Sequence, residues 1–243
     1  MSEKASSFKS NLSNLLWAIK AFWGDNKEKA NERYFLKQTK NMIPDYVNNN
    51  SLKKLNIGSQ DHPFEGWLNV DIFAFEGVAY MDATKPFPIA DNCFDYVFSE
   101  HMIEHITFDE ANFMLKECYR IMKPGARIRI ITPGLDKLIL LYGNTTDTML
   151  KKYTDDLIQP TFNTPITPHI DYALNYISYN YLHKFIHSTQ TLSHLLTLNG
   201  FKNIKSYELY KSDDPNLSNI EIHAKLIGED KYDFESIYIE AEK

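Results

Sequence analysis

Lys53 to Asp71, KKLNIGSQDHPFEGWLNVD, is the stretch that decides the fold. A short apolar run ends at Gly58, and a second apolar run, Trp67 to Val70, ends at the acidic residue Asp71. In a parallel sheet this order is strand, glycine turn, strand and carboxylate, the outline of a nucleoside-binding edge. Glycine lets the backbone come close to a ligand, and an acid that closes the next strand can hold both ribose hydroxyls. The stretch therefore predicts a nucleoside site between Gly58 and Asp71.

Further strand and helix signals follow at short intervals. Strands are expected at 53–57, 67–71, 78–82, 94–99 and 127–132, and helices at 107–122 and 189–199. The loop between the first two strands is too short for a full crossover helix, so we expect a turn there. Residues 201–209 and 219–227 alternate apolar and polar side chains and predict a closing antiparallel hairpin. The chain is therefore expected to be an α/β protein with a mixed, mostly parallel sheet, a C-terminal antiparallel hairpin and helices on both faces.

The domain organisation is expected to be one main domain with two additions. Residues 1–50 predict an N-terminal helical extension, with helices near 11–23 and 28–47 and a boundary at the asparagine tract 48–50. Residues 51–243 form the main domain. Residues 135–188 interrupt it with three prolines and many tyrosines, and an insertion after a strand's carboxyl end is where α/β enzymes place a lid or substrate pocket. The alternative is a structural cap.

Composition narrows the class of protein. The net charge of −6 argues against a general nucleic-acid binder, which usually has a basic surface. Cys93 and Cys118 have no partner spacing and are expected to be free thiols, which suits a reducing cytoplasm. No apolar run reaches the roughly 18 residues of a membrane span. We therefore expect a cytoplasmic protein.

Residues 11–23 place six apolar side chains on one helical stripe, namely Leu12, Leu15, Leu16, Ile19, Phe22 and Trp23. Such a helix can pack on the domain or on a second copy of the chain, in a homo-oligomer. The alternative is peripheral contact with an anionic membrane surface, because the segment is basic and carries tryptophan.

Four polar positions mark the expected ligand site. Gly58, Asp71, Asp82 and Ser99 each fall at the carboxyl end of a separately predicted strand. The carboxyl ends of parallel strands meet at one edge of a sheet, and ligands of open α/β sheets bind there. Agreement among four strands is stronger than any one motif.

Several segments together carry a family resemblance. They are LNIGSQ (55–60), GWLNVDI (66–72), DATKPFPIADNCFDYVFSEHMIEHI (82–106), ECYRIMKPGARIRIITP (117–133) and, more weakly, HKFIHSTQTLSHLLTLNGF (183–201). With them the chain resembles the class I S-adenosylmethionine-dependent methyltransferases, nearest to a small-molecule branch associated with surface-polysaccharide and other glycan pathways. The resemblance implies a Rossmann-like fold, S-adenosyl-L-methionine as cofactor and a small polar or glycan acceptor, with O-methylation of a sugar hydroxyl expected first. N-methylation of an amino sugar or amine is the nearest alternative.

The resemblance also implies roles for particular residues. Gly58 would approach the methionine part of the cofactor, Asp71 the ribose hydroxyls and Asp82 the adenine amino group. Ser99 and Glu100 would border the reacting methyl. The full set of expected cofactor contacts is Gly58, Ser59, Gln60, Asp71, Ile72, Asp82, Ala83, Ser99 and Glu100.

Two positions depart from the family pattern. Gln60 stands where a second glycine is usual and could re-shape the methionine site, and Ala126 replaces a glycine in the turn before the fifth strand. The first departure keeps a second class of function open, a methyltransferase-like protein that binds a partner or nucleotide without turnover.

The densest ionisable cluster is Glu100 to His105. A hydroxyl acceptor requires a general base, and His101 is the first candidate, supported by Glu104 or His105. The alternative is that these residues only orient the loop or hydrogen-bond the cofactor. HMIEH also matches H-x-x-E-H, a zinc-peptidase pattern. Because it begins at a strand end and no third-ligand signature follows, no metal site is expected.

Three further histidines, His169, His183 and His187, are candidates for the acceptor pocket, since they lie in or beside the aromatic insertion. His62 is expected only to shape the glycine loop. His194 and His223 are expected to be helix-surface and strand residues.

Overall fold

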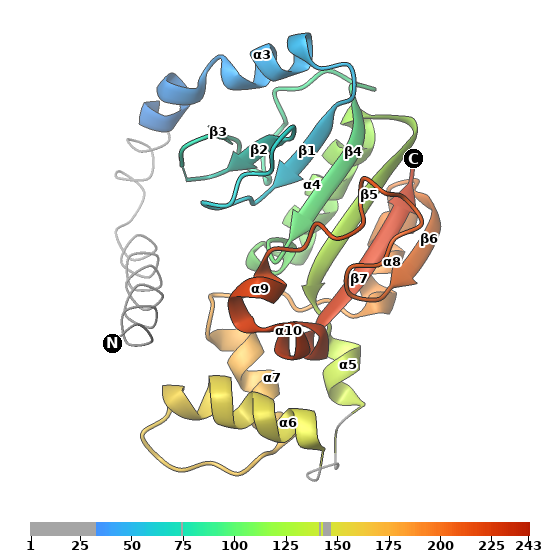
Figure 1. Cartoon of the computed structure of the whole chain (residues 1–243). Coiled ribbons are helices and arrows are strands. Elements are labelled where there is room, and N and C mark those ends of the chain that lie inside the picture. Colours follow the sequence, from blue (N-terminus) through green and yellow to red (C-terminus); the bar gives the residue numbers. More distant parts are fainter. Residues whose placement is uncertain (1–32, 74, 141, 143–146) are drawn as a thin grey trace.

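The computed structural model describes residues 33–73, 75–140, 142 and 147–243. The described residues include one seven-stranded sheet with the order β3-β2-β1-β4-β5-β7-β6 (Figure 1). The strands are β1 (Lys54–Ile57), β2 (Leu68–Asp71), β3 (Val78–Tyr80), β4 (Phe94–Glu100), β5 (Met122–Pro133), β6 (Lys202–Tyr207) and β7 (Ser236–Glu242). β1 to β5 pair in parallel, and β7 runs antiparallel to both β5 and β6. The expected Rossmann-like mixed sheet with a C-terminal antiparallel pair is confirmed.

The strand order reverses beside β1. Ile57 pairs in register with Val70 of β2 on one side and with Ser99 of β4 on the other. The carboxyl ends of these strands therefore lie side by side, and this is the topological switch point at which open α/β sheets bind ligands. Within the described residues no helix separates β1 from β2, so the expected turn is also confirmed.

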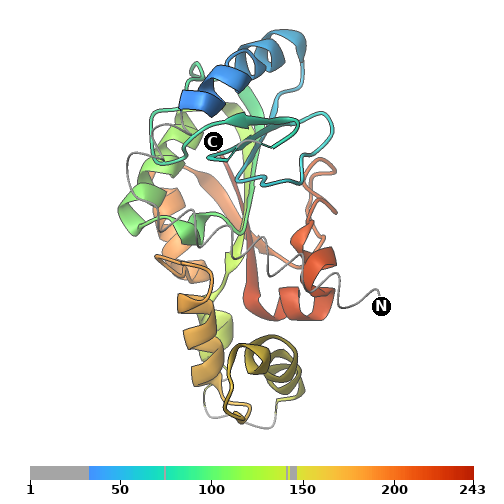
Figure 2. The same ribbon diagram turned by 90° about the vertical axis from the view of Figure 1, so that its left-hand side faces the viewer.

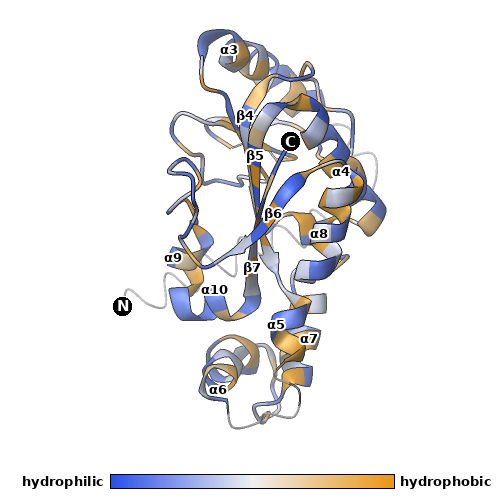
Figure 3. Ribbon diagram, turned by 90° about the vertical axis from the view of Figure 1, so that its right-hand side faces the viewer, coloured by the Kyte–Doolittle hydropathy of each residue, from blue (hydrophilic) through white to orange (hydrophobic). Residues whose placement is uncertain are grey.

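One face of the sheet is covered by two helices, α4 (Phe108–Ile121) and α8 (Thr189–Leu198), as Figures 2 and 3 show. Thr107 starts α4 with a capping box, because its hydroxyl accepts from the Glu110 N–H while the Glu110 carboxylate accepts from the Thr107 N–H. Apolar strand residues such as Leu55 and Val97 are fully buried in the same core as Met114 of α4. A third helix, α3 (Met42–Asn49), lies near the amino end of β4, where the ring of Tyr46 stacks on that of Phe94.

The other face carries the connection between β6 and β7, which includes α9 (His223–Ile227) and α10 (Glu229–Glu235) (Figure 2). The strand expected at 219–227 is therefore wrong, and the true partner of β6 is β7. Its alternation has a different cause. Glu221 turns inward to a buried ion pair with Arg129 of β5, and the N–H groups of Ile222 and His223 donate to the Glu100 carboxylate instead of a neighbouring strand.

The described residues between 135 and 179 form a helical lobe next to the carboxyl edge of the sheet (Figure 1). Its elements are α5 (Leu135–Ile139), α6 (Thr148–Tyr153), a π-helical turn (Thr154–Ile158), a 3₁₀ turn (Gln159–Thr161) and α7 (Ile170–Tyr179). The lobe has a small core of its own that includes Leu138, Tyr153 and Ile177. The division of the chain at residue 50 and the insertion limits 135–188 stay predictions.

The predicted helix at 11–23 lies outside the described residues. In the part of the chain that the structure describes, no helix is long and apolar enough to cross a membrane.

Candidate functional site

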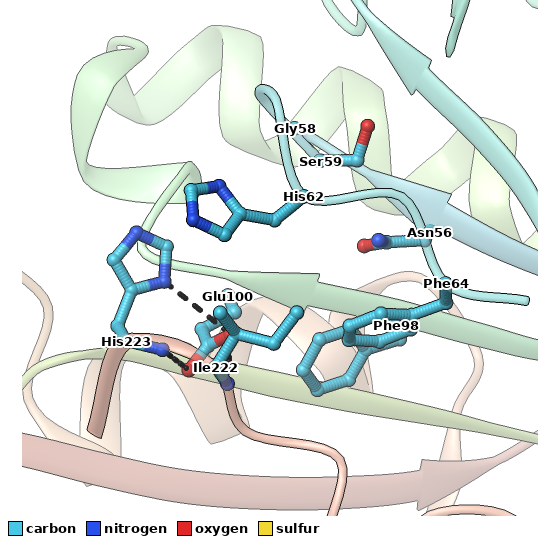
Figure 4. A pocket seen from close by; sticks show the side chains of 9 residues that line it. All are labelled: Asn56, Gly58, Ser59, His62, Phe64, Phe98, Glu100, Ile222 and His223. Atoms are coloured by element: carbon cyan, nitrogen blue, oxygen red, sulfur yellow. Dashed lines mark hydrogen bonds and ion pairs between the residues drawn. The ribbon is translucent and has the colours of Figure 1, made fainter. Parts of the chain in front are cut away.

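A narrow crevice lies at the switch point, between the ends of β1 and β4 and the β6–β7 connection (Figure 4). It is lined by Asn56, Gly58, Ser59, His62, Phe64, Phe98, Glu100, Ile222 and His223. His62 and His223 lie at one end of the crevice, and the rings of Phe64 and Phe98 lie at the other. Its volume is about 220 Å³, open solvent included. Even with open solvent counted, this space is smaller than the roughly 300–1,000 Å³ that small-molecule pockets usually enclose. The crevice can therefore enclose only part of a nucleoside-sized ligand.

Gly58 is the residue that allows the turn after β1. Its φ of +76° is in the left-handed region, and a Cβ there would lie 2.4 Å from Cγ of Met102. No side chain fits at that distance. In this structure the close approach that Gly58 permits is therefore made by Met102, from the loop after β4.

Gln60 has a structural role that its sequence position did not reveal. It takes a left-handed φ of +48°, and its N–H donates to Oδ2 of Asp71 at 3.0 Å. The exposed Gln60 side chain points out of the core, so what the loop uses is the backbone of this residue. The strand-ending carboxylate therefore holds the glycine loop in place.

Asp71 lies buried at the end of β2. Oδ1 accepts the N–H of Phe73 at 2.9 Å while Oδ2 accepts that of Gln60. Burial raises the pKa of Asp71, and these backbone hydrogen bonds offset part of the shift. Each carboxylate oxygen has a second lone pair, so ribose hydroxyls can still be accepted. Ile72 next to it is 47% exposed, an apolar face beside the carboxylate.

Asp82 follows β3 and is engaged locally. Its Oδ1 accepts from the N–H and the hydroxyl of Thr84, and Oδ2 pairs with Lys85 at 3.0 Å. Burial alone would raise the pKa of Asp82, but the hydrogen bonds from Thr84 and the Lys85 charge lower it. Overall its pKa is lowered, so the group is ionised at neutral pH. Ala83 is buried in the main core.

Ser59 and Ser99 carry buried hydroxyls that, among the described residues, have no hydrogen-bond partner. A buried polar atom without a partner is costly and is usually satisfied by something outside the chain. These hydroxyls, the Asp71 carboxylate and the exposed face of Ile72 fit the polar and apolar parts of a nucleoside cofactor. The crevice itself has room for only part of such a cofactor.

Glu100 at the end of β4 is joined to a residue far along the chain. Its Oε2 lies 3.3 Å from Nδ1 of His223, and its Oε1 accepts from the Tyr232 hydroxyl at 2.5 Å. Burial opposes ionisation of both groups, but the pair outweighs it. The pKa of His223 is raised and that of Glu100 is lowered. His223 is therefore a crevice residue that the sequence assigned to a strand, and no local spacing could have revealed it.

His101, the first candidate base, is in contact with this pair through the ring of His223. Its ring stacks on His223 with centroids 5.3 Å apart, and its Nε2 hydrogen-bonds Oγ of Ser236 at 3.0 Å. Burial and the neighbouring histidines lower the pKa of His101 well below its usual value, so the ring is neutral. Both ring nitrogens face protein groups, since Nδ1 lies 3.4 Å from Oε1 of Glu104.

Glu104 and His105 belong to the 3₁₀ turn that follows (Ile103–His105). Glu104 is fully buried, and burial raises its pKa to about 8. Burial lowers the pKa of His105 to about 3. His183, from the loop after α7, packs its ring against His105 with centroids 4.7 Å apart. The structure thus joins His183 to the Glu104 cluster.

The other acceptor candidates lie elsewhere. His169 caps α7 in the helical lobe, where Nδ1 accepts from the Asp171 N–H. His187 is fully buried, and within the described ranges its ring nitrogens have no hydrogen-bond partner. His62, expected only to shape the loop, lines the crevice and pairs with Asp61 at 2.7 Å.

Residues 67–130 match a family model described as a methyltransferase domain. The matched span contains Asp71, Asp82, Ser99 and Glu100, whereas Gly58 and His223 lie outside it. No curated protein sequence matches this chain significantly.

Solved structures with similar folds include three methyltransferases. One, an S-adenosylmethionine-dependent methyltransferase of Archaeoglobus fulgidus, is 20% identical, with 87% of this chain and 94% of that chain covered and a TM-score of 0.45. A Thermotoga maritima protein described as a possible histamine N-methyltransferase is 15% identical, with coverages of 87% and 93% and a TM-score of 0.48. The Haemonchus contortus phosphoethanolamine N-methyltransferase 2 is 14% identical, with coverages of 84% and 52% and a TM-score of 0.46. At these values none of the three indicates the acceptor of this chain.

Proposed function

We propose that this chain, which contains an S-adenosylmethionine-dependent methyltransferase domain, methylates a hydroxyl of a small polar acceptor, in the first place a sugar or glycan. The observation that carries the proposal is the Glu100–His223 pair at the switch point of the sheet. A hydroxyl must lose its proton during methyl transfer, whereas a neutral amine can attack without a base. A carboxylate-held histidine in the crevice therefore favours oxygen over nitrogen as the acceptor atom.

The cofactor is proposed to contact the residues expected from the sequence. When bound, it supplies an activated methyl group on a sulfonium. Asp71 would accept the ribose hydroxyls with its remaining lone pairs, Ile72 and Ala83 would border the adenine, and Asp82 would accept from its amino group. The backbone of Gly58 to Gln60 and the unpaired hydroxyls of Ser59 and Ser99 would face the methionine part.

The proton acceptor is proposed to be His223. Glu100 orients its ring and stabilises the charge that forms on it. His101 stacks on the ring of His223 and acts as a positioning residue. Glu104 and His105 in turn support His101. The protein otherwise contributes placement, because holding the acceptor in line makes the reaction effectively intramolecular.

A sugar acceptor is supported by exposed aromatic side chains at the end of α7. Tyr179, the last residue of α7, and Tyr181, in the loop after it, are 77% and 39% exposed, and such rings can stack on the apolar face of a sugar. His183 and His187 lie on the chain just after them and are the proposed acceptor-side histidines, with His169 at the base of α7.

The test is an acceptor screen read out by release of S-adenosylhomocysteine. Nucleotide sugars and glycans form one panel and amines the other, each with wild type and with His223→Gln. We expect turnover on the hydroxyl panel and a loss of about 10²-fold or more in the variant. Turnover on amines alone would overturn O-methylation. Calorimetry that detects no S-adenosylmethionine binding at millimolar concentration would overturn the proposed cofactor site itself.

A further inference from the structure

Three potential ligands converge beneath the crevice. Glu104 and His105 come from the 3₁₀ turn after β4, and His183 comes from the loop after α7. One ligand atom of each lies within 4.8 Å of the other two, and Nε2 of His183 lies 4.0 Å from Oε1 of Glu104. From this geometry we propose that Glu104, His105 and His183 bind a divalent transition-metal ion, with zinc as the first candidate. Only Glu104 and His105 of the HMIEH pattern belong to this group, and His183 takes the place of His101.

The three side chains also make the supporting hydrogen bonds that metal ligands usually have. Metal-binding histidines usually donate their other ring N–H to a carbonyl or carboxylate, which fixes the tautomer. Nδ1 of His183 donates to the Ile177 carbonyl, which leaves the Nε2 lone pair facing Glu104. His105 hydrogen-bonds the backbone of Tyr181. The carboxylate is held too, because the Thr132 hydroxyl donates to Oε2 of Glu104 at 3.0 Å.

The charge balance of the cluster also favours a cation. Glu104 is fully buried, and in the described part of the chain its Oε1 has no hydrogen-bond partner. Across the same residues, its ion pairs are with the histidines His101 and His183 and with no lysine or arginine. A buried carboxylate without a permanent cation is expensive to ionise. A bound metal ion would supply the missing positive charge, and protonation of Glu104 is the competing solution.

Two imidazoles and one carboxylate suit zinc, which takes this donor set with water in a fourth position. With zinc–ligand distances of about 2.0–2.1 Å, neighbouring ligands of a tetrahedral site lie about 3.4 Å apart. The His183–Glu104 separation of 4.0 Å therefore has to shrink by roughly half an ångström. The widest separation among the three ligand atoms, at most 4.8 Å, has to shrink by up to about 1.4 Å. Ferrous iron and cobalt accept the same donors, so the metal is decided by analysis.

Such an ion would link the loop after α7 to the 3₁₀ turn after β4. The N–H groups of Lys184 and Phe185 already donate to the Glu104 carbonyl, at 2.7 and 3.2 Å. A metal bond from His183 would add a second link between the same two segments. The inference stands independently of methyl transfer, because it concerns metal binding in the absence of cofactor and acceptor.

The test uses the full chain, purified without a metal-affinity tag, stripped by a chelator and dialysed against zinc chloride. We expect one zinc per chain by elemental analysis. Cobalt(II) should give the visible absorption of a tetrahedral site with nitrogen and oxygen ligands. Zinc should raise the melting temperature by several degrees, since a ligand that binds the folded state stabilises it.

Four variants make the assignment specific. His183→Gln and Glu104→Gln should lose the cobalt spectrum and at least 10-fold in zinc affinity. His194→Gln, an exposed histidine on α8, should keep both. Thr132→Val keeps the buried shape and removes only the hydroxyl that holds Glu104, so it should weaken zinc about 10-fold even if a ligand variant fails to fold. Less than one tenth of a zinc per chain, or binding unchanged in both His183→Gln and Thr132→Val, would overturn the proposal.

Discussion

Nδ1 of His223 lies 3.3 Å from Oε2 of Glu100, and this pair joins the end of β4 to the start of α9. The same carboxylate accepts the N–H groups of Ile222 and His223. Glu100 therefore holds both the backbone and the ring of the connection that covers the crevice. It places a titratable imidazole beside the glycine turn, where a methyl acceptor would have to lie.

Glu100→Gln should change the pH dependence of methyl transfer. The carboxylates of Glu100, Glu104 and Glu235 raise the pKa of His223 against the lowering effect of burial. A base works only when unprotonated, so activity should fall as the pH drops through this raised pKa. Removing the Glu100 charge lowers the pKa, so the acid limb of kcat/KM should move to lower pH. The maximal kcat should fall about 10- to 100-fold.

The matched control is Glu65→Gln, an exposed acid on the glycine loop, which should leave the profile unchanged. A profile of Glu100→Gln that keeps its wild-type midpoint would show that His223 is not the titrating group. The stability sign is separate. Since the folded pKa of His223 is raised, its pairing stabilises the fold below the unfolded pKa and is lost as pH rises through the folded value.

Asp71→Ala should weaken S-adenosylmethionine binding by about 10- to 100-fold, roughly 1.4–2.8 kcal/mol. The variant loses the acceptor proposed for the ribose hydroxyls and also the anchor of the Gln60 N–H. Isothermal calorimetry measures the change. Glu65→Ala is the control, because it removes an exposed acid from the same loop. Equal affinities of wild type and Asp71→Ala would remove Asp71 from the cofactor site.

The strands and the ligand edge could be read from local sequence. Apolar runs that stop at Gly58 and Asp71 specify where β1 and β2 end, and parallel pairing then brings those ends together. Two features could not be read. The alternation of apolar and polar residues at 220–226 resembles that of a strand. Glu221 instead forms a buried ion pair with Arg129 of β5, a strand far away in the sequence. The partners Glu100–His223 and Glu104–His183 likewise exist only after the helical lobe and the β6–β7 connection have folded onto the sheet.

Gln60 offers a test of what its unusual position costs. Its φ of +48° is unfavourable for residues other than glycine. Gln60→Gly relieves this strain but adds conformational freedom to the unfolded chain, so the free energy of unfolding should change by less than about 1 kcal/mol. Gln60→Val should destabilise by about 1–2 kcal/mol, because a β-branched residue is penalised most there. Urea denaturation measures both. A valine variant as stable as wild type would mean that the loop adopts another backbone conformation in solution.

Arg129→Met should destabilise the protein by about 3–5 kcal/mol, because it leaves Glu221 and Glu240 buried without their cation. Arg127→Met, two residues away, breaks a half-buried pair with Glu242 and should cost about 1 kcal/mol or less. Glu221 belongs to the connection that carries His223, so kcat should fall with Arg129→Met and not with Arg127→Met. Chemical denaturation and kinetics at a temperature where both variants are folded check the two effects. Equal stabilities of the two variants would contradict the buried network.

The contact between Gly58 and Met102 can be tested with a double-mutant cycle. In Gly58→Ala the new Cβ would lie 2.4 Å from Cγ and 2.7 Å from Cβ of Met102. Overpacking and left-handed strain together should cost about 2–4 kcal/mol. Met102→Ala alone should cost about 1–3 kcal/mol through lost packing.

In the double variant the 2.4 Å clash with Cγ is gone, while the 2.7 Å contact with Cβ of residue 102 remains. The alanine at 58 should therefore cost at least about 1 kcal/mol less than it does beside Met102. The coupling energy between the two sites should therefore be at least about 1 kcal/mol, with the double variant more stable than the sum of the single changes predicts. Urea denaturation of all four proteins measures it. Strict additivity would mean that Met102 does not sit on Gly58 in solution, and the glycine turn would then be open to the cofactor without any movement of this side chain.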